Sequence, residues 1–212
     1  AEVWKKFYKP FRAGKTLVVK PTWEPYEAAA GDRIIEIDPG MAFGSGTHET
    51  TGMCLELLEE SLHGGESVID VGTGAGFPGM VLAILAPAAR FTLLDSLGKR
   101  VDFLQEVCRA LHLQNVTCVH ARAEEFAGAH RESYDVAVSR AVAQLNVLCE
   151  LTLPLVKVGG IFAAMKSVSS DEEIRAARSA AAQLGGQIAA STDYTVPETD
   201  VVHRIVDIQK VR

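Results

Sequence analysis

The stretch "SVIDVGTGAGFPG", from Ser67 to Gly79, decides the fold. Its first five residues have the composition of a buried strand, and Gly72, Gly74 and Gly76 then let the backbone turn sharply. Pro78 favours the start of a helix directly after this turn. A strand, a glycine-rich loop and a helix in this order are typical of the unit that binds a nucleotide in an α/β fold.

Strands and helices alternate around this unit. Apolar strands that alternate with helices predict a parallel sheet covered on both faces, within one domain over residues 1–212. The last two strand-like segments follow each other without a helix, which predicts a closing antiparallel pair. The predicted strands after the loop are "FTLLD", "NVTCVH", "YDVAVS", "IFAAMK", "GQIAASTDYTV" and "HRIVDIQKV", and the predicted helices cover 47–62, 99–111, 145–156 and 170–184.

Side-chain caps are expected at two of these helices. Ser96 is the candidate cap of the helix over 99–111. Ser170 precedes the helix over 170–184, and Glu173 follows it at the spacing of a capping box.

Composition excludes several classes of protein. The net charge of −6 over 212 residues argues against a protein that coats nucleic acid. The first twenty residues are basic and aromatic; they are expected to pack on the domain, with RNA contact as the alternative. No apolar run approaches the ~20 residues that span a bilayer, and the N-terminus lacks the apolar core of a secretory signal. The four cysteines lack metal-site spacing, so reduced thiols in a cytoplasmic protein without metal are expected.

Two carboxylates flank the glycine loop in the sequence. Asp70 lies near the end of the first strand, and Asp95 ends the next strand, where a carboxylate can bind both hydroxyls of a ribose. The spacing of Gly74, Gly76 and Gly79 also fits a nicotinamide dinucleotide. However, a carboxylate at Asp70 suits a cofactor with a positive ammonium or sulfonium better than a pyrophosphate. The chain also has no second nucleotide-binding half. S-adenosylmethionine is therefore the expected cofactor.

The C-terminal two-thirds of the chain resembles one known family. The segments "VIDVGTGAGFPG", "FTLLDSLGKRVDFL", "RAEEF", "YDVAVSRAVAQL" and "LPLVKVGGIFAAMK" are similar, in this order, to the bacterial small-subunit ribosomal RNA guanine methyltransferases. The resemblance implies a Rossmann-like class I S-adenosylmethionine-dependent methyltransferase fold with a mostly parallel seven-stranded sheet. It also implies that the cofactor site is lined by Gly72, Phe77, Ala123, Glu124 and Arg140.

Basic residues in the same family take part in function. The resemblance implies that Arg140 holds the cofactor carboxylate or an RNA phosphate, and it makes Lys166 a second candidate catalytic residue. Arg122 and the pair His203–Arg204 fall near other functional positions. Two departures stand out, because Ser167 replaces a glycine and Arg204 is displaced by one residue. A shift of one residue along a strand turns a side chain to the opposite face.

The first sixty residues resemble a second family. "FRAGKTLVVKPTWEP", "DPGMAFGSGTHETT" and "CLELLE" are similar to the lysine methyltransferases that modify a large-subunit ribosomal protein. This resemblance implies that Thr51 lines the cofactor site, with Thr50 beside it. We interpret the chain as a chimera, with 1–60 from one family and 65–212 from the other. The clean match of each part favours recombination in the laboratory. The full set of expected cofactor contacts is Thr50, Thr51, Asp70, Gly72, Gly74, Gly76, Phe77, Asp95, Ser96, Ala123, Glu124 and Arg140.

Three functions agree with these patterns: a ribosomal RNA methyltransferase, a cofactor binder without turnover, and a protein methyltransferase. N7 of guanine has a free lone pair and needs no general base, whereas a lysine amine must first lose a proton. No candidate base stands out, which favours the nucleobase as methyl acceptor. We expect a monomer that binds the cofactor and turns over weakly or not at all. The expected partner is ribosomal RNA or the small subunit, with a ribosomal protein as the alternative and no membrane contact.

Overall fold

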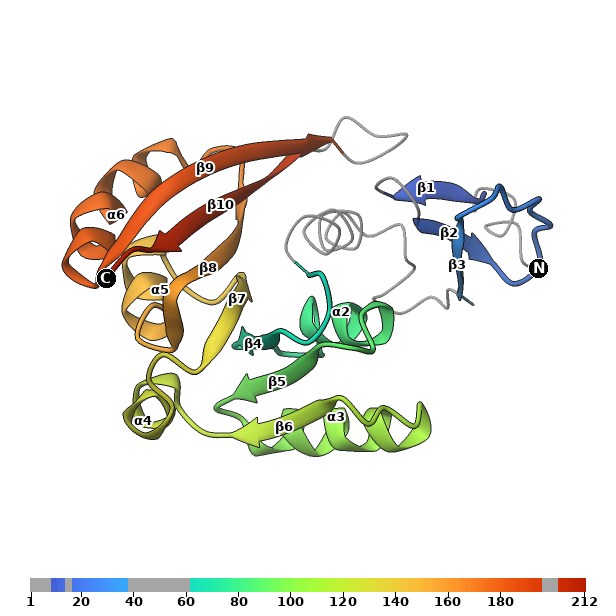
Figure 1. Ribbon diagram of the computed structural model, residues 1–212, viewed down its shortest axis with the longest axis horizontal. Helices are drawn as coiled ribbons and strands as arrows, with labels where there is room; N and C mark the ends of the chain where they lie inside the picture. Colours follow the sequence, from blue (N-terminus) through green and yellow to red (C-terminus); the bar gives the residue numbers. More distant parts are fainter. Residues whose placement is uncertain (1–8, 14–16, 38–61, 196–201) are drawn as a thin grey trace.

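The computed structural model describes residues 9–13, 17–37, 62–195 and 202–212 (Figure 1). Except for Leu62, the predicted helix over 47–62 lies outside these residues, as does the glycine-rich stretch over 38–51. The described strands are β1 (Phe11–Ala13), β2 (Leu17–Pro21), β3 (Arg33–Ile37), β4 (Ser67–Val71), β5 (Arg90–Asp95), β6 (Val116–His120), β7 (Tyr134–Arg140), β8 (Val156–Ser167), β9 (Gly186–Thr195) and β10 (Val202–Lys210). The described helices are α2 (Gly79–Leu85), α3 (Gly98–Ala110), α4 (Ala123–Ala129), α5 (Leu145–Thr152) and α6 (Asp171–Gln183).

The strands form two sheets. The larger sheet has seven strands in the order β6-β5-β4-β7-β8-β10-β9, and the smaller one has the order β1-β2-β3. Strands β4 to β8 pair in parallel, whereas β10 runs antiparallel to both β8 and β9. The mostly parallel seven-stranded sheet and its antiparallel end, both predicted from the sequence, are confirmed.

Helices cover both faces of the larger sheet, as Figure 1 shows. Val68 and Phe91 pack on the face that carries α2, and Leu93, on that same face, packs against Leu104 of α3. Ile69 and Leu94 are the next residues along their strands, and they belong to the cluster that contains residues of α4, α5 and α6. Successive side chains of a strand point to opposite faces, so strands buried on both faces must be apolar throughout.

The chain changes direction at β4. It proceeds from β4 to β5 and β6 on one side, and then returns to β7 and β8 on the other side of β4. In open α/β sheets such a switch leaves a crevice at the carboxyl ends of the strands, where ligands bind. The glycine loop after Val71 and the loop after Arg140 both lie at this edge, because each follows the carboxyl end of its strand.

The predicted side-chain caps were wrong. Ser170 does occupy the residue before α6, but its side chain makes no capping hydrogen bond. Glu173 turns away to contacts in other elements. The N-cap of α3 is Leu97 and not Ser96, and no side chain caps this helix; the Leu97 N–H donates to the Asp95 carboxylate. The buried Ser170 hydroxyl has no hydrogen-bond partner among the described residues, so the carboxylate of Glu173 is the part of the expected capping box that finds partners in other elements.

Candidate functional site

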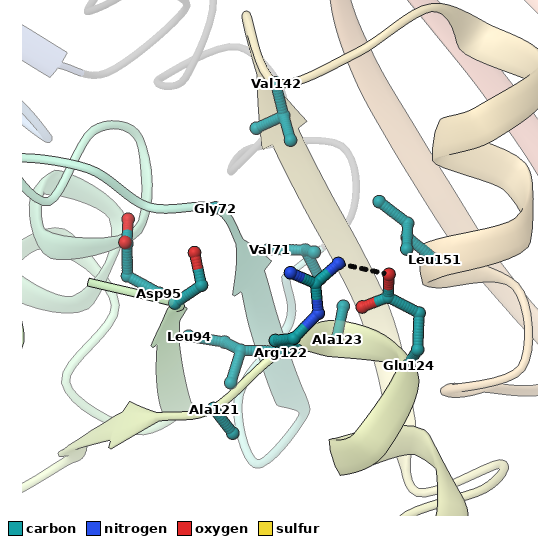
Figure 2. A pocket seen from close by; sticks show the side chains of 11 residues that line it. Val71, Gly72, Leu94, Asp95, Ala121, Arg122, Ala123, Glu124, Val142 and Leu151 are labelled. Atoms are coloured by element: carbon teal, nitrogen blue, oxygen red, sulfur yellow. Dashed lines mark hydrogen bonds and ion pairs between the residues drawn. The ribbon is translucent and has the colours of Figure 1, made fainter. Parts of the chain in front are cut away.

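A pocket of about 200 Å³ opens at the carboxyl ends of β4, β5 and β6. Figure 2 shows Asp95 and Leu94 on one side of it, Leu151 on the other and Arg122 between them. Among the predicted cofactor residues, the pocket brings together Gly72, Asp95, Ser96, Ala123 and Glu124. The complete lining is Val71, Gly72, Leu94, Asp95, Ser96, Ala121, Arg122, Ala123, Glu124, Val142 and Leu151.

Asp95 anchors one end of the pocket. Its side chain is almost fully buried, and Oδ2 accepts a hydrogen bond from the backbone N–H of Gly74 at 2.9 Å. Oδ1 accepts the N–H of Leu97 at 2.9 Å, and Arg100 lies 3.4 Å from Oδ2. A carboxylate oxygen has about two accepting positions, so Oδ1 can take one further donor. The carboxylate thus holds the glycine loop and is still able to accept a ligand hydroxyl.

Two glycines of the loop have a left-handed backbone, and one of them also faces a close neighbour. Gly72 has φ +72°, and a Cβ there would lie 2.4 Å from Cγ2 of Val142. Gly74 has φ +61°, but a Cβ at that position would meet no atom within 4 Å. Both backbones are left-handed, which disfavours any side chain with a Cβ. At Gly72 the close approach of Val142 adds a second constraint.

Asp70 supports the loop from beneath. Only 1% of the residue is exposed, and its Oδ2 accepts hydrogen bonds from the Thr73 hydroxyl at 2.7 Å and the Gly79 N–H at 2.8 Å. Its Oδ1 has no hydrogen-bond partner among the described residues. Burial raises the pKa of Asp70 to about 6, against the lowering effect of those two hydrogen bonds. Asp70 therefore holds the turn and lies outside the lining of the pocket.

Arg140 and Phe77 lie together outside that lining. The guanidinium carbon of Arg140 is 5.9 Å from the centroid of the Phe77 ring, the distance of a cation–π contact. Arg140 ends β7, two residues before Val142, which does line the pocket. A Cβ on Gly76 would lie 2.9 Å from Leu104, so this glycine packs against α3. Some of the predicted cofactor residues thus line the pocket, whereas Phe77, Gly76 and Arg140 lie outside its lining.

Lys166 is engaged in an ion pair. Its side chain is about 10% exposed, and Nζ lies 2.5 Å from Oε1 of Glu173. The same ammonium donates to the backbone carbonyl of Ala143 at 2.7 Å. Arg204, directly opposite Lys166 across the β8–β10 pair, contacts Asp171 and Asp193 at 2.6 Å each. Both cations are held among carboxylates at this end of the sheet.

Arg122 was predicted near a functional position, and it does line the pocket. Its Nη2 donates to Glu124 Oε1 at 3.1 Å, and both side chains are more than half exposed (Figure 2). Five apolar lining residues were missed by sequence reasoning. Three of them adjoin or follow strand ends and could have been found from that position, whereas Val142 and Leu151 carry no such signal. The missed residues are Val71, Leu94, Ala121, Val142 and Leu151.

Thr50 and Thr51 lie outside the described residues, so their predicted place beside the cofactor stays a prediction. Among the described residues, no helix has both the length and the apolar character of a bilayer span.

Comparison with known sequences gives one family. A family model described as "GidB: rRNA small subunit methyltransferase G" matches residues 53–198. "Ribosomal RNA small subunit methyltransferase G" of Alkaliphilus metalliredigens is 49% identical over 148 residues, which cover 69% of this chain and 62% of that protein. The protein of the same name from Ligilactobacillus salivarius is 44% identical over 167 residues, covering 77% and 69%. The chain thus spans about 62% of the length of the first of these relatives.

Solved structures agree on the fold. The ribosomal protein L11 methylase of Lactobacillus delbrueckii subsp. bulgaricus matches with a TM-score of 0.69 at 20% identity, over 97% of this chain and all of that one. M. jannaschii TYW2, solved in complex with AdoMet, matches with a TM-score of 0.64 at 15% identity, over 96% and 100%.

Identities this low show the fold alone, and they confirm the predicted class I methyltransferase fold. Both resemblances read from the sequence, to the ribosomal RNA enzymes and to the ribosomal-protein methylases, also appear among these matches. The family match over 53–198 covers well over half of the 212 residues. The chain therefore belongs to the GidB family of rRNA small subunit methyltransferases G.

Proposed function

We propose that this chain is the core of an S-adenosylmethionine-dependent methyltransferase that acts on a guanine of small-subunit ribosomal RNA. The relatives are named as methyltransferases of small-subunit ribosomal RNA, and guanine is the acceptor that the resemblance of the sequence implies. The observation that carries the proposal is the pocket at the switch of strand order. It combines one buried carboxylate, Asp95, with apolar walls at the edge where nucleotides bind in this kind of sheet.

The residues present suit the cofactor. A volume of about 200 Å³ lies below the ~300–1,000 Å³ of ordinary ligand sites, so the pocket matches the nucleoside half. Oδ1 of Asp95 would accept a ribose hydroxyl, and Leu94 and Ala123 would pack against the base. Asp70 lies under the loop as a negative charge opposite in sign to the sulfonium. Arg140, beside the pocket, would pair with the carboxylate of the cofactor or with an RNA phosphate.

The cofactor supplies an electrophilic methyl group when it is bound. The task of this chain is to bind and align the two reactants, which supplies up to ~7–11 kcal/mol of the barrier. N7 of guanine carries a free lone pair, so no residue has to remove a proton. The contacts of Lys166 with Glu173 and Ala143 support a role in positioning for this predicted catalytic residue.

We propose a monomer without a required metal, working on ribosomal RNA in the cytoplasm. The family match begins at residue 53, upstream of the boundary expected between the parts 1–60 and 65–212. Residues before the match are proposed to derive from the second methyltransferase family that they resemble. Because the aligned region covers 62% of the first relative, cofactor binding without turnover is the second candidate function.

Two measurements test these proposals in turn. Titration calorimetry with S-adenosylmethionine should give saturable heat for the wild type. Asp95→Asn should bind on the order of 10-fold more weakly or worse, because a charged hydrogen-bond acceptor is lost. Asp193→Asn removes the same charge from an ion pair outside the pocket and should bind like the wild type. A wild-type protein that gives no heat at millimolar cofactor would refute the cofactor site.

The acceptor is identified by incubating undermethylated small ribosomal subunits with cofactor that carries a labelled methyl group. Label in the RNA, at N7 of guanine after nuclease digestion, supports the proposed reaction. Label in protein supports the methyltransferase activity of the N-terminal relatives. A protein that binds the cofactor and transfers no label is the binder without turnover.

A further inference from the structure

One wall of the pocket is a short segment whose backbone is strained. Val142, in the connection from β7 to α5, lines the pocket and faces Gly72, where a Cβ would lie 2.4 Å from its Cγ2. The residue before it, Ala141, has φ +53°. A residue with a Cβ rarely adopts this left-handed conformation, which persists only where the surrounding structure enforces it. The wall must therefore be held from elsewhere.

Glu173 and Lys166 hold this segment at two points. Oε1 of Glu173, on α6, accepts a hydrogen bond from the backbone N–H of Leu145, the first residue of α5. The same oxygen forms the 2.5 Å ion pair with Lys166 of β8. The Lys166 ammonium then donates to the Ala143 carbonyl at 2.7 Å. The pair thus binds a donor and an acceptor of the backbone that immediately follows Val142.

The Lys166–Glu173 pair is largely buried, so its loss should change the position of the segment 141–145. The side chain of Lys166 is 10% exposed and that of Glu173 is 27% exposed. Truncation of Glu173 leaves the Leu145 N–H and the Lys166 ammonium without the oxygen that accepts from both, so the segment loses this attachment. Another acid in the same turn of α6 does something different: Asp171 is 76% exposed and pairs with Arg204 of β10.

We propose that Glu173 is a positioning residue of the cofactor site. Through Leu145 and through Lys166 it fixes the segment 141–145, and so sets Val142 against the glycine loop and Arg140 beside Phe77. It acts through these residues and does not line the pocket itself. The inference rests on the proposed function for its binding assay, and a second readout in the ligand-free protein makes it testable separately.

Three variants separate positioning from general stability. Glu173→Ala should raise the dissociation constant for S-adenosylmethionine on the order of 10-fold or more, since a loss of ~1.4 kcal/mol of binding free energy through the displaced wall already gives a tenfold change. Glu173→Gln keeps an oxygen acceptor for Leu145 and Lys166 and should recover most of the affinity. Asp171→Asn removes an acid from the same helical turn and should bind like the wild type. Circular dichroism and cooperative thermal unfolding verify that each variant is folded.

The ligand-free readout is amide hydrogen exchange. Glu173→Ala should accelerate exchange at Leu145 and its neighbours in 141–145, because the Leu145 N–H loses its acceptor, while Asp171→Asn should leave these amides unchanged. If Glu173→Ala does not fold, Lys166→Met takes its place, with weaker binding and faster exchange again expected. Equal affinity and equal exchange in the wild type and the folded variant would overturn the inference. A wild type that binds no cofactor, with exchange still dependent on Glu173, refutes the proposed function and leaves the positioning contact supported.

Discussion

Replacement of Gly72 by alanine tests the contact that shapes the pocket. The new Cβ would lie 2.4 Å from Cγ2 of Val142 and 3.2 Å from its Cγ1, on a backbone with φ +72°. Gly74→Ala is the matched control, because its φ of +61° is similar and a Cβ there meets no atom within 4 Å. The two variants share the backbone strain, and only the first has the collision.

The two contributions can be sized separately. A left-handed residue with a Cβ costs ~1–2 kcal/mol, and the loss of unfolded-state entropy on replacing glycine returns ~0.4–1 kcal/mol. Gly74→Ala should therefore lower the unfolding free energy by about 1 kcal/mol. Displacement of Val142 adds the ~1–3 kcal/mol of an overpacked site, so Gly72→Ala should lose ~2–4 kcal/mol. For a domain of this size each 1 kcal/mol shifts Tm by ~2–4 °C.

Urea unfolding of four proteins measures these quantities: the wild type, Gly74→Ala, Gly72→Ala, and Gly72→Ala combined with Val142→Ala. Truncation of Val142, which is 40% exposed, removes the collision at little cost of its own. The double variant should return to the stability of Gly74→Ala. If Gly72→Ala is no less stable than Gly74→Ala, or if the Val142 truncation restores nothing, the packing of Val142 on the loop is not as described.

Three further predictions concern a buried charge, the core and the rim of the pocket. The pKa of Asp70 is raised from 3.8 to about 6. The contribution of its protonated carboxyl to the unfolding free energy is therefore fully present below about pH 4 and is lost as pH rises through 6, because the carboxyl ionises more readily in the unfolded chain. Relative to Asp70→Asn, the unfolding free energy of the wild type should fall by about 3 kcal/mol between about pH 4 and pH 7; urea titrations that show a constant difference would contradict the raised pKa. Phe162→Ala, at a fully buried ring, should cost ~3–5 kcal/mol by chemical denaturation, and a loss below ~1 kcal/mol would be inconsistent with a core position. Arg122→Ala breaks the exposed pair with Glu124 and should change stability by less than ~0.5 kcal/mol; a fall in Tm above ~5 °C in calorimetry would show a larger role.

The fold could be predicted from the sequence wherever the pattern is local. The run from Val68 to Val71 is buried throughout, and apolar strands alternating with helices are sufficient to predict a sheet covered on both faces. The order of the strands could not be predicted in this way. The position of β10 between β8 and β9 depends on long-range pairing, which no single segment encodes.

The candidate site was predictable where its residues end or follow strands. Asp95 ends β5 and Ala123 follows β6, and the carboxyl ends of parallel strands meet at one edge of the sheet. Val142 and Leu151 resemble ordinary core residues in the sequence, and only the packing of the β7–α5 segment brings them to the pocket. The sequence correctly placed Asp70 at the glycine loop, but it could not show that the carboxylate accepts hydrogen bonds from Thr73 and Gly79 within the loop.

The capping box at Ser170 failed for a related reason. Its spacing to Glu173 is a sound local signal, but the carboxylate finds stronger partners in Lys166 and the Leu145 amide. A charged donor from another strand outweighs a single amide in the same helical turn. Local patterns are therefore least reliable where an ionised side chain can reach a buried partner of opposite charge.

The separate pairing of the small sheet has a consequence for how such proteins can be rebuilt. Among the residues that the structure describes, β1, β2 and β3 form backbone ladders only with one another. An exchange of this piece for a counterpart from another protein would break no ladder of the seven-stranded sheet. The three strands can thus be exchanged as one piece while every strand pairing of the larger sheet is kept.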